Sequence, residues 1–128
     1  MKDIENKEDI ELLVDTFYDN LLKVEGINEF FGKVVPIDWA HHKPIMVGFW
    51  EFILFMTPNA YMGNVMNPHL DLNHKKMITP EHFEQWLRTF NETVDQLFSG
   101  TKADDAKNAA FSIGATMKYK IKKANENK

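Results

Sequence analysis

Helical spacing of the apolar residues is the feature of this 128-residue chain that most restricts its fold. Near the N-terminus, apolar side chains recur at the i, i+3, i+4 and i+7 positions that form one face of an amphipathic helix. These residues are Ile10, Leu13, Val14, Phe17, Leu21 and Leu22. No segment alternates apolar and polar residues with the two-residue period of a half-buried strand. The sequence therefore predicts an all-α fold.

Capping and turn residues divide this pattern into four main helices with shorter helical pieces between them. The first helix ends near Gly26, and the second covers about residues 39–56, with Pro44 inside it as a kink or a restart. The third helix opens at Thr79-Pro80, and the fourth begins near Ala103. Two shorter helical pieces are expected, one around residues 30–31 and one around residue 69.

Composition limits both the organisation and the chemistry of the chain. Its length fits one domain over residues 1–128, with the first few residues and the tail from about Lys118 frayed. The absence of cysteine excludes disulfides, Cys-ligated metals and thiol nucleophiles. A formal charge of −4 argues against nonspecific binding of nucleic acid. The N-terminus lacks the apolar core of a signal peptide, and the longest apolar stretch, residues 44–56, is too short to cross a membrane. We therefore expect a cytoplasmic protein without a nucleic-acid or membrane partner.

The histidines do not form a familiar zinc or hydrolase pattern. No two of them flank a glutamate at the i, i+4 spacing of a helical zinc site, and neither a Ser-His-Asp pattern nor a glycine-rich phosphate loop is evident. The five are His41, His42, His69, His74 and His82. The residues to weigh are instead one histidine outside the long helices and polar-tipped aromatic residues on their apolar faces.

Each of these residues also has a purely structural explanation. His42 lies on an apolar helix face, where a buried histidine commonly bonds a backbone carbonyl. The Tyr18 hydroxyl needs only a hydrogen-bond partner, Trp86 fits simple core packing, and His69 alone is an ordinary residue of a loop or helix start. Taken together, these four residues suggest a functional site. Two opposed histidines with a phenol and an indole between them have the chemistry of a haem pocket.

Five segments in a fixed order strengthen this hypothesis. They are DIELLVDTFYDN at residues 9–20, Phe30-Phe31, Asp38-Trp39-x-x-His42 followed by Phe49-Trp50, Tyr61-Met62-Gly63 followed by His69-Leu70-Asp71-Leu72, and His82-Phe83-x-x-Trp86-Leu87. Together they resemble the truncated haemoglobins, and within them the third group. The first two groups typically carry Gly-Gly pairs, and the third group typically lacks them. This chain has no Gly-Gly pair, which favours the third group.

The resemblance implies a truncated globin fold, a two-over-two helical sandwich, around a b-type haem. In that fold His69 is the proximal ligand of the haem iron, and Phe31 and Met46 pack on the haem. A thioether link to the haem is excluded because the chain has no cysteine.

The same resemblance implies a polar distal site. It places Tyr18 and Trp86 as hydrogen-bond donors to the bound gas, with His42 as the distal histidine beside the haem. The neighbouring His41 competes for that position, but the helix stripe favours His42, three residues after Trp39 and four before Met46.

The expected function is reversible binding of O₂, CO and NO by a bacterial haem protein of the oxygen-transport type. An NO dioxygenase or peroxidase-like activity, supported by a reductase partner, is the alternative that uses the same haem, so the sequence leaves open whether the protein is an enzyme. A haem-free helical interaction module is a further alternative, in which the aromatic residues are simply core.

Overall fold

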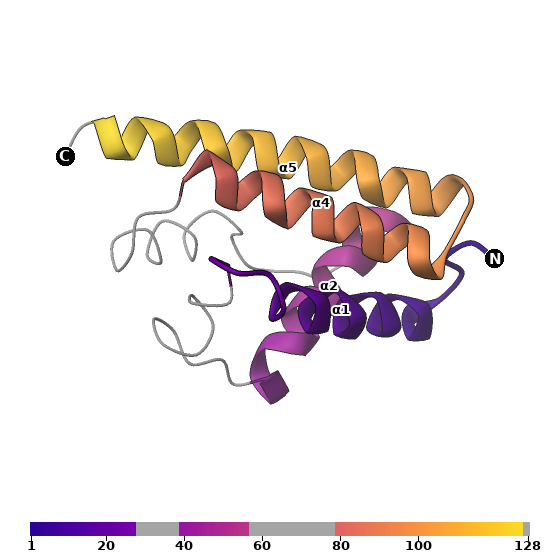
Figure 1. Ribbon diagram of the computed structural model, residues 1–128. Coiled ribbons are helices and arrows are strands. Elements are labelled where there is room, and N and C mark those ends of the chain that lie inside the picture. Colours follow the sequence, from indigo (N-terminus) through magenta and orange to yellow (C-terminus); the bar gives the residue numbers. More distant parts are fainter. Residues whose placement is uncertain (28–38, 57–78, 127–128) are drawn as a thin grey trace.

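The computed structural model describes residues 1–27, 39–56 and 79–126 of the chain. These residues form four α-helices and no strand, in the order α1 (Lys7–Leu21), α2 (Trp39–Phe55), α4 (Pro80–Leu97) and α5 (Thr101–Glu126) (Figure 1). The predicted all-α class is therefore confirmed. The shorter helical pieces expected around residues 30–31 and around residue 69 lie outside the described residues.

Local sequence signals set both ends of α1. The Asn6 side chain caps the helix by accepting a hydrogen bond of 3.0 Å from the Asp9 N–H. The helix ends at Leu21, and the chain then turns through Gly26, whose φ of 94° lies in the left-handed region that favours glycine. The helix thus stops five residues before the glycine that we expected to end it.

The prolines of α2 and α4 have different positions and different effects. Pro44 lies inside α2, yet the helix continues through it from Trp39 to Phe55. Pro80 opens α4 directly after the cap residue Thr79, as the sequence predicts. The Thr79 N–H donates to Nδ1 of His82 over 2.9 Å, so the side chain of the first turn satisfies the N–H of the cap.

The last helix is longer than the sequence predicts at both ends. It begins at Thr101 and continues as far as Glu126, past Lys118 where we expected the chain to fray. Met117 and Ile121, one turn apart, are buried on its inner face and extend the packed stripe into the predicted tail. At the other terminus Ile4 is only 2% exposed, so the first residues of the chain also pack against the helices.

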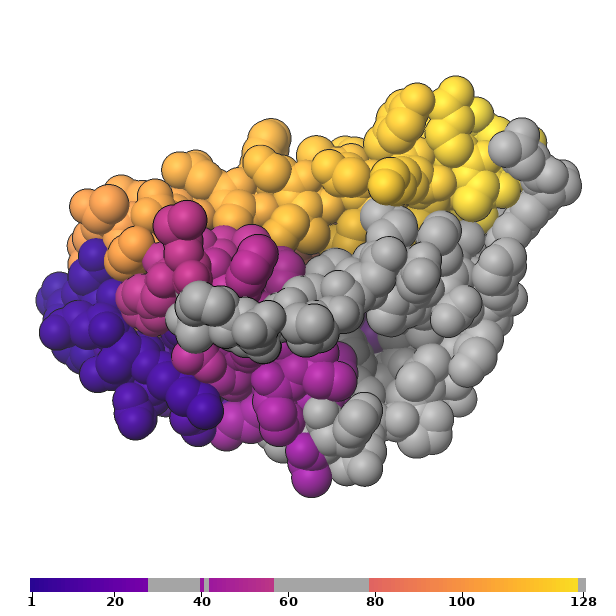
Figure 2. All heavy atoms as spheres, turned by 180° about the vertical axis from the view of Figure 1, so that it is seen from behind, coloured from indigo at the N-terminus to yellow at the C-terminus, as the bar shows by residue number. Residues whose placement is uncertain are grey.

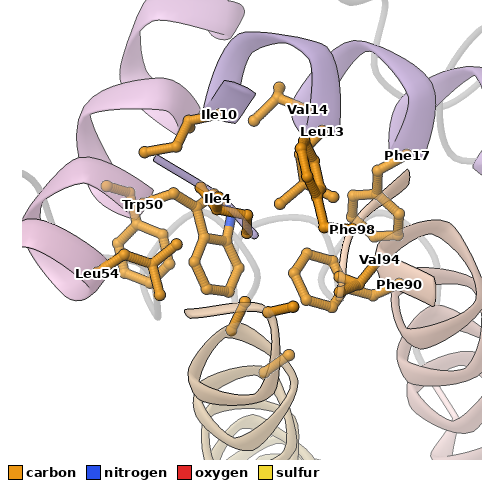
Figure 3. Packing of buried hydrophobic residues seen from close by; sticks show 14 of the residues in the cluster. Ile4, Ile10, Leu13, Val14, Phe17, Trp50, Leu54, Phe90, Val94 and Phe98 are labelled. Atoms are coloured by element: carbon orange, nitrogen blue, oxygen red, sulfur yellow. The ribbon is translucent and has the colours of Figure 1, made fainter. Parts of the chain in front are cut away.

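The helices pack as two crossing pairs around one hydrophobic core. Figure 1 shows α4 and α5 side by side, with α1 and α2 crossing beneath them, and contacts join α4 to α1 and α2 to both α1 and α5. Phe90 is fully buried where three helices meet (Figure 3). Its ring stacks on Trp50 of α2 at 4.9 Å and meets Phe17 of α1 edge-on at 5.0 Å. Such aromatic pairs contribute stability beyond their buried area.

Helix α2 is apolar on more than one side. Trp50 and Leu54 turn into the core, whereas Phe52 is 47% exposed. From behind, α2 reaches the surface between the N-terminal residues and α5 (Figure 2). None of the described helices is long and apolar enough to cross a membrane.

Candidate functional site

A hydrogen bond between α1 and α2 joins two of the residues singled out in the sequence. The hydroxyl of Tyr18 and Nε2 of His42 lie 3.1 Å apart, and their rings meet edge-on with centroids separated by 5.3 Å. Both side chains are partly buried. The structure thus turns His42 toward α1 and brings it together with Tyr18.

The helix phase of α1 explains the position of Tyr18. Phe17 occupies the middle of the buried face and is 3% exposed, so the next residue along the helix lies at the edge of that face. The Tyr18 ring leans on the Phe17 ring at a centroid distance of 5.4 Å, which leaves its hydroxyl directed at α2.

Burial controls the protonation of the phenol. It raises the pKa of Tyr18 well above the ordinary value, because a phenolate would lose its hydration. The hydroxyl therefore stays protonated at neutral pH and remains a hydrogen-bond donor. When the hydroxyl donates to Nε2 of His42, it has no proton left for a third group. When the Nε2–H of His42 donates to the tyrosine oxygen, the phenolic proton is free to point elsewhere.

Trp86 is held by rings on two helices and by a glycine on a third. Its indole packs edge-on against Phe17 at 5.9 Å and stacks with Phe90 at 6.0 Å. On the other side, a Cβ placed on Gly114 of α5 would lie 3.5 Å from Cζ3 of the indole. Trp86 and Tyr18 thus both contact the ring of Phe17.

The remaining candidate residues divide between the described and the undescribed parts of the chain. Met46 lies on α2 one turn after His42 and packs, partly buried, against the core. Phe31 and His69 lie outside the described residues, as does His74. Within the described ranges, no group of three or more His, Asp or Glu side chains is placed to hold a metal ion.

Three charged residues beside the hydrogen-bonded pair were not singled out in the sequence. Lys43 Nζ lies 2.8 Å from Oδ2 of Asp15 and 4.0 Å from Oε2 of Glu11, which joins α2 to α1 a second time. The available signal was local. Asp15 lies one turn before Tyr18, and Lys43 follows His42 directly, but only the crossing of the two helices brings them together.

Comparison with known proteins defines the class. The chain matches the model of the bacterial-like globin family over residues 2–120, and it belongs to that family. It is also similar to a solved structure, the group III truncated hemoglobin from Campylobacter jejuni. That similarity has a TM-score of 0.80 and 26% sequence identity, and it covers 94% of this chain and 95% of the other. The resemblance to the third group and the truncated globin fold, both predicted from the sequence, are confirmed. A search of curated proteins gave no match.

Proposed function

We propose that this globin binds a b-type haem and reversibly binds O₂, CO and NO beside Tyr18. The observation that carries the proposal is the Tyr18–His42 hydrogen bond of 3.1 Å, with the rings of Tyr18 and Trp86 both in contact with Phe17. When bound, the haem supplies an iron atom that takes up diatomic gases. In this proposal His69 holds that iron, and the haem-contacting side chains come from the following set: Phe31, His42, Met46, His69 and Trp86.

The chemistry of the described residues fits such a group. A porphyrin needs apolar and aromatic walls, and Met46 of α2 and Trp86 of α4, both partly buried against the core, can supply them. A bound gas that gains partial negative charge needs neutral donors nearby, and the phenol of Tyr18 and the indole of Trp86 are donors of that kind. Since Tyr18 remains protonated, it can serve this role throughout the neutral pH range.

The direction of the hydrogen bond between Tyr18 and His42 then determines whether the phenol can donate to a bound gas. While the two groups stay bonded, Tyr18 can donate to a gas ligand only when the Nε2–H of His42 donates to the tyrosine oxygen. In the opposite arrangement the phenol is satisfied by the imidazole and gives no stabilisation to a ligand. His42 thus determines whether the strongest donor of the site is available.

Hydrogen bonds from two donors, Tyr18 and Trp86, to one bound gas would slow its release. Slow release suits NO dioxygenation or peroxide chemistry supported by a reductase better than it suits oxygen transport. We accordingly propose these redox activities, in the cytoplasm of a bacterium, as the second candidate function. Multiple-turnover consumption of NO or peroxide in the presence of a reductant distinguishes an enzyme from a passive binder.

The first experiment is the optical spectrum of the purified chain in ferric, ferrous and CO-bound forms. We expect a Soret band that survives desalting in the wild type and is lost, or greatly weakened, in His69→Ala. The matched control is His82→Ala, because His82 Nδ1 is engaged at the start of α4. A colourless protein that takes up no added hemin would favour a haem-free helical module. Normal haem retention by His69→Ala would remove His69 as the ligand.

The role of Tyr18 is tested separately in Tyr18→Phe. We expect O₂ to dissociate about 10- to 100-fold faster, because a hydrogen bond to a partly charged acceptor in a dry site contributes about 1.5–3 kcal/mol. Stopped-flow replacement of O₂ by CO measures the rate. Tyr119→Phe is the matched control, since Tyr119 is 62% exposed on α5. An unchanged rate in Tyr18→Phe would remove the phenol from the mechanism.

A further inference from the structure

The ion pair between Lys43 and Asp15 involves the same two helical turns as the Tyr18–His42 hydrogen bond. On α1, Asp15 and Tyr18 are three residues apart and therefore share a face. On α2, His42 and Lys43 are consecutive. The polar link of 3.1 Å and the ionic link of 2.8 Å thus hold the first turn of α2 at neighbouring points of α1.

That turn of α2 is weakly held by its own helix. Pro44 has no N–H and cannot donate to the carbonyl of Ala40, which is the bond that would continue the helical ladder there. The segment that carries His42 and Lys43 lies directly before this break. Its position therefore depends more than usual on contacts outside the helix, and α1 provides two of them.

We propose that Lys43 and Asp15 are positioning residues: their ion pair holds the first turn of α2 against α1 and thereby sets the Tyr18–His42 hydrogen bond. The positioning is a property of the chain itself. Its consequence for gas binding rests on the proposed function.

The exposure of the pair decides what kind of effect it has. The Lys43 and Asp15 side chains are 27% and 41% exposed, and ion pairs of this kind contribute little to global stability. The hydrogen bond with Asp15 raises the pKa of Lys43, so the lysine stays charged wherever the protein is folded at neutral pH. Loss of the ion pair should therefore leave the fold intact. It should shift only the equilibrium between the first turn of α2 held against α1 and the same turn detached from α1.

The experiment compares Lys43→Met and Asp15→Asn with the wild type. Lys43→Met keeps the length of the side chain and removes its charge. The first readout is the ¹⁵N spectrum of the His42 ring in protein labelled at histidine, recorded on the diamagnetic CO form or on the chain without haem. The second is the O₂ dissociation rate. We expect both variants to increase the population of a broken His42–Tyr18 bond about two- to five-fold, and to change the O₂ dissociation rate by up to a similar factor.

Salt and a rescue variant extend the test. Raising NaCl from about 0.1 M to about 1 M shortens the screening length from about 10 to about 3 Å. We expect this change to move the wild-type spectrum part of the way toward that of Lys43→Met and to have no further effect on Lys43→Met. Lys43→Arg keeps the charge and should behave as the wild type. In a Tyr18→Phe background, Lys43→Met should leave the O₂ rate unchanged, because no hydrogen bond remains to be positioned.

The matched control is Lys107→Met, which breaks a pair of 2.7 Å between Lys107 and Asp95 on α5 and α4. We expect it to leave the His42 spectrum unchanged. The proposal is overturned if His42 is unaffected in both Lys43→Met and Asp15→Asn, or if Lys107→Met shifts it equally. Pro44→Ala in the Lys43→Met protein should restore the bond by completing the helical ladder, and failure to do so overturns the role given to Pro44. If the chain binds no haem, the proposed function fails, while the ¹⁵N spectrum still decides the positioning.

Discussion

At the scale of single residues, Gly100, directly before α5, and Gly114, within α5, differ in which atoms an added methyl group would contact. A Cβ at Gly114 would lie 3.5 and 3.8 Å from carbons of the Trp86 ring, which is ordinary contact. A Cβ at Gly100 would lie 2.6 Å from Cγ of Asp3, and the φ of 141° there is one that only glycine adopts easily.

We therefore predict opposite effects of the same substitution. Gly114→Ala should raise the free energy of unfolding by about 0.5–1 kcal/mol, because alanine has the higher helix propensity. Gly100→Ala should lower it by about 1–3 kcal/mol through backbone strain and overlap with Asp3. Urea unfolding followed by circular dichroism measures both. A destabilised Gly114→Ala would mean that α5 and Trp86 pack more tightly than ordinary contact.

Site residues that lie on an apolar helix face could be predicted from the sequence. Contacts between charged residues far apart in the chain could not. Tyr18, His42 and Trp86 could be selected because their helix phase is readable from neighbouring apolar residues. Lys43 and Asp15 are 28 residues apart, and their contact depends on how α1 and α2 cross, which no local pattern encodes. Phe31 and His69, selected by resemblance, stay predictions because the described residues do not include them.

At the scale of elements, α5 has a cap that comes from the opposite end of the sequence. Its N-cap position is Gly100, which has no side chain, and the carboxylate of Asp3 takes over by accepting hydrogen bonds from the Lys102 and Ala103 N–H groups at 2.9 and 2.8 Å. Ser99 adds a third tie, donating its N–H to the Lys2 carbonyl over 3.0 Å. The capping residue lies about 100 positions away in the sequence, so no local signal marks Thr101 as the start of α5. The predicted start near Ala103 was therefore two residues too late.

The cap predicts a specific acid sensitivity. Burial alone would raise the pKa of Asp3, but the hydrogen bonds from Lys102, Ala103 and Ile4 outweigh it and lower that pKa below the ordinary value. A carboxyl with a lowered pKa in the folded state stabilises the protein above its unfolded pKa, about 4, and loses that contribution as the pH falls through its folded pKa.

Asp3→Asn should therefore lower the free energy of unfolding at pH 7 by less than the loss of about 1 kcal/mol that follows complete removal of a capping side chain, because the amide keeps one acceptor oxygen. It should also make stability fall less steeply as the pH drops below about 4. Part of the slope should remain, because the pKa of Asp9 is lowered as well, by hydrogen bonds from Lys2 and the Glu5 N–H that outweigh its burial. Urea unfolding at a series of pH values is the measurement. An unchanged slope in Asp3→Asn would show that the cap forms no part of the acid response.

At the scale of the whole molecule, the order of motifs identified the fold more securely than any single motif did. The family match over residues 2–120 includes α1, α2 and α4 in full and α5 as far as residue 120, so the resemblance is carried by the ordered set of segments and their spacing. The all-α class followed from apolar periodicity, because each stripe must be buried against another helix. The angle at which the helix pairs cross was not readable from that periodicity, and the Tyr18–His42 contact depends on it.

The rings around Phe90 hold the two helix pairs together, and this gives the largest stability effect that we predict. Phe90 on α4 meets Phe17 of α1 and Trp50 of α2, and it also stacks on Trp86, so one side chain connects the core to the candidate site. Phe90→Ala should lower the free energy of unfolding by about 3–5 kcal/mol, the usual loss for a fully buried phenylalanine. Phe111→Ala on α5 should change it by less than about 0.5 kcal/mol, because Phe111 is 63% exposed.

Urea unfolding measures both free energies, and near-ultraviolet circular dichroism reports the packing of the aromatic side chains, Trp50 and Trp86 among them, in the folded state. We expect Phe90→Ala to lose much of that aromatic signal while it keeps its helical signal, since the helices retain their other apolar contacts. Because Trp86 rests partly on Phe90, O₂ release should also change in Phe90→Ala and stay as in the wild type in Phe111→Ala. Equal losses of stability in the two variants would mean that the core does not depend on this ring, and the link drawn between core and site would then be wrong.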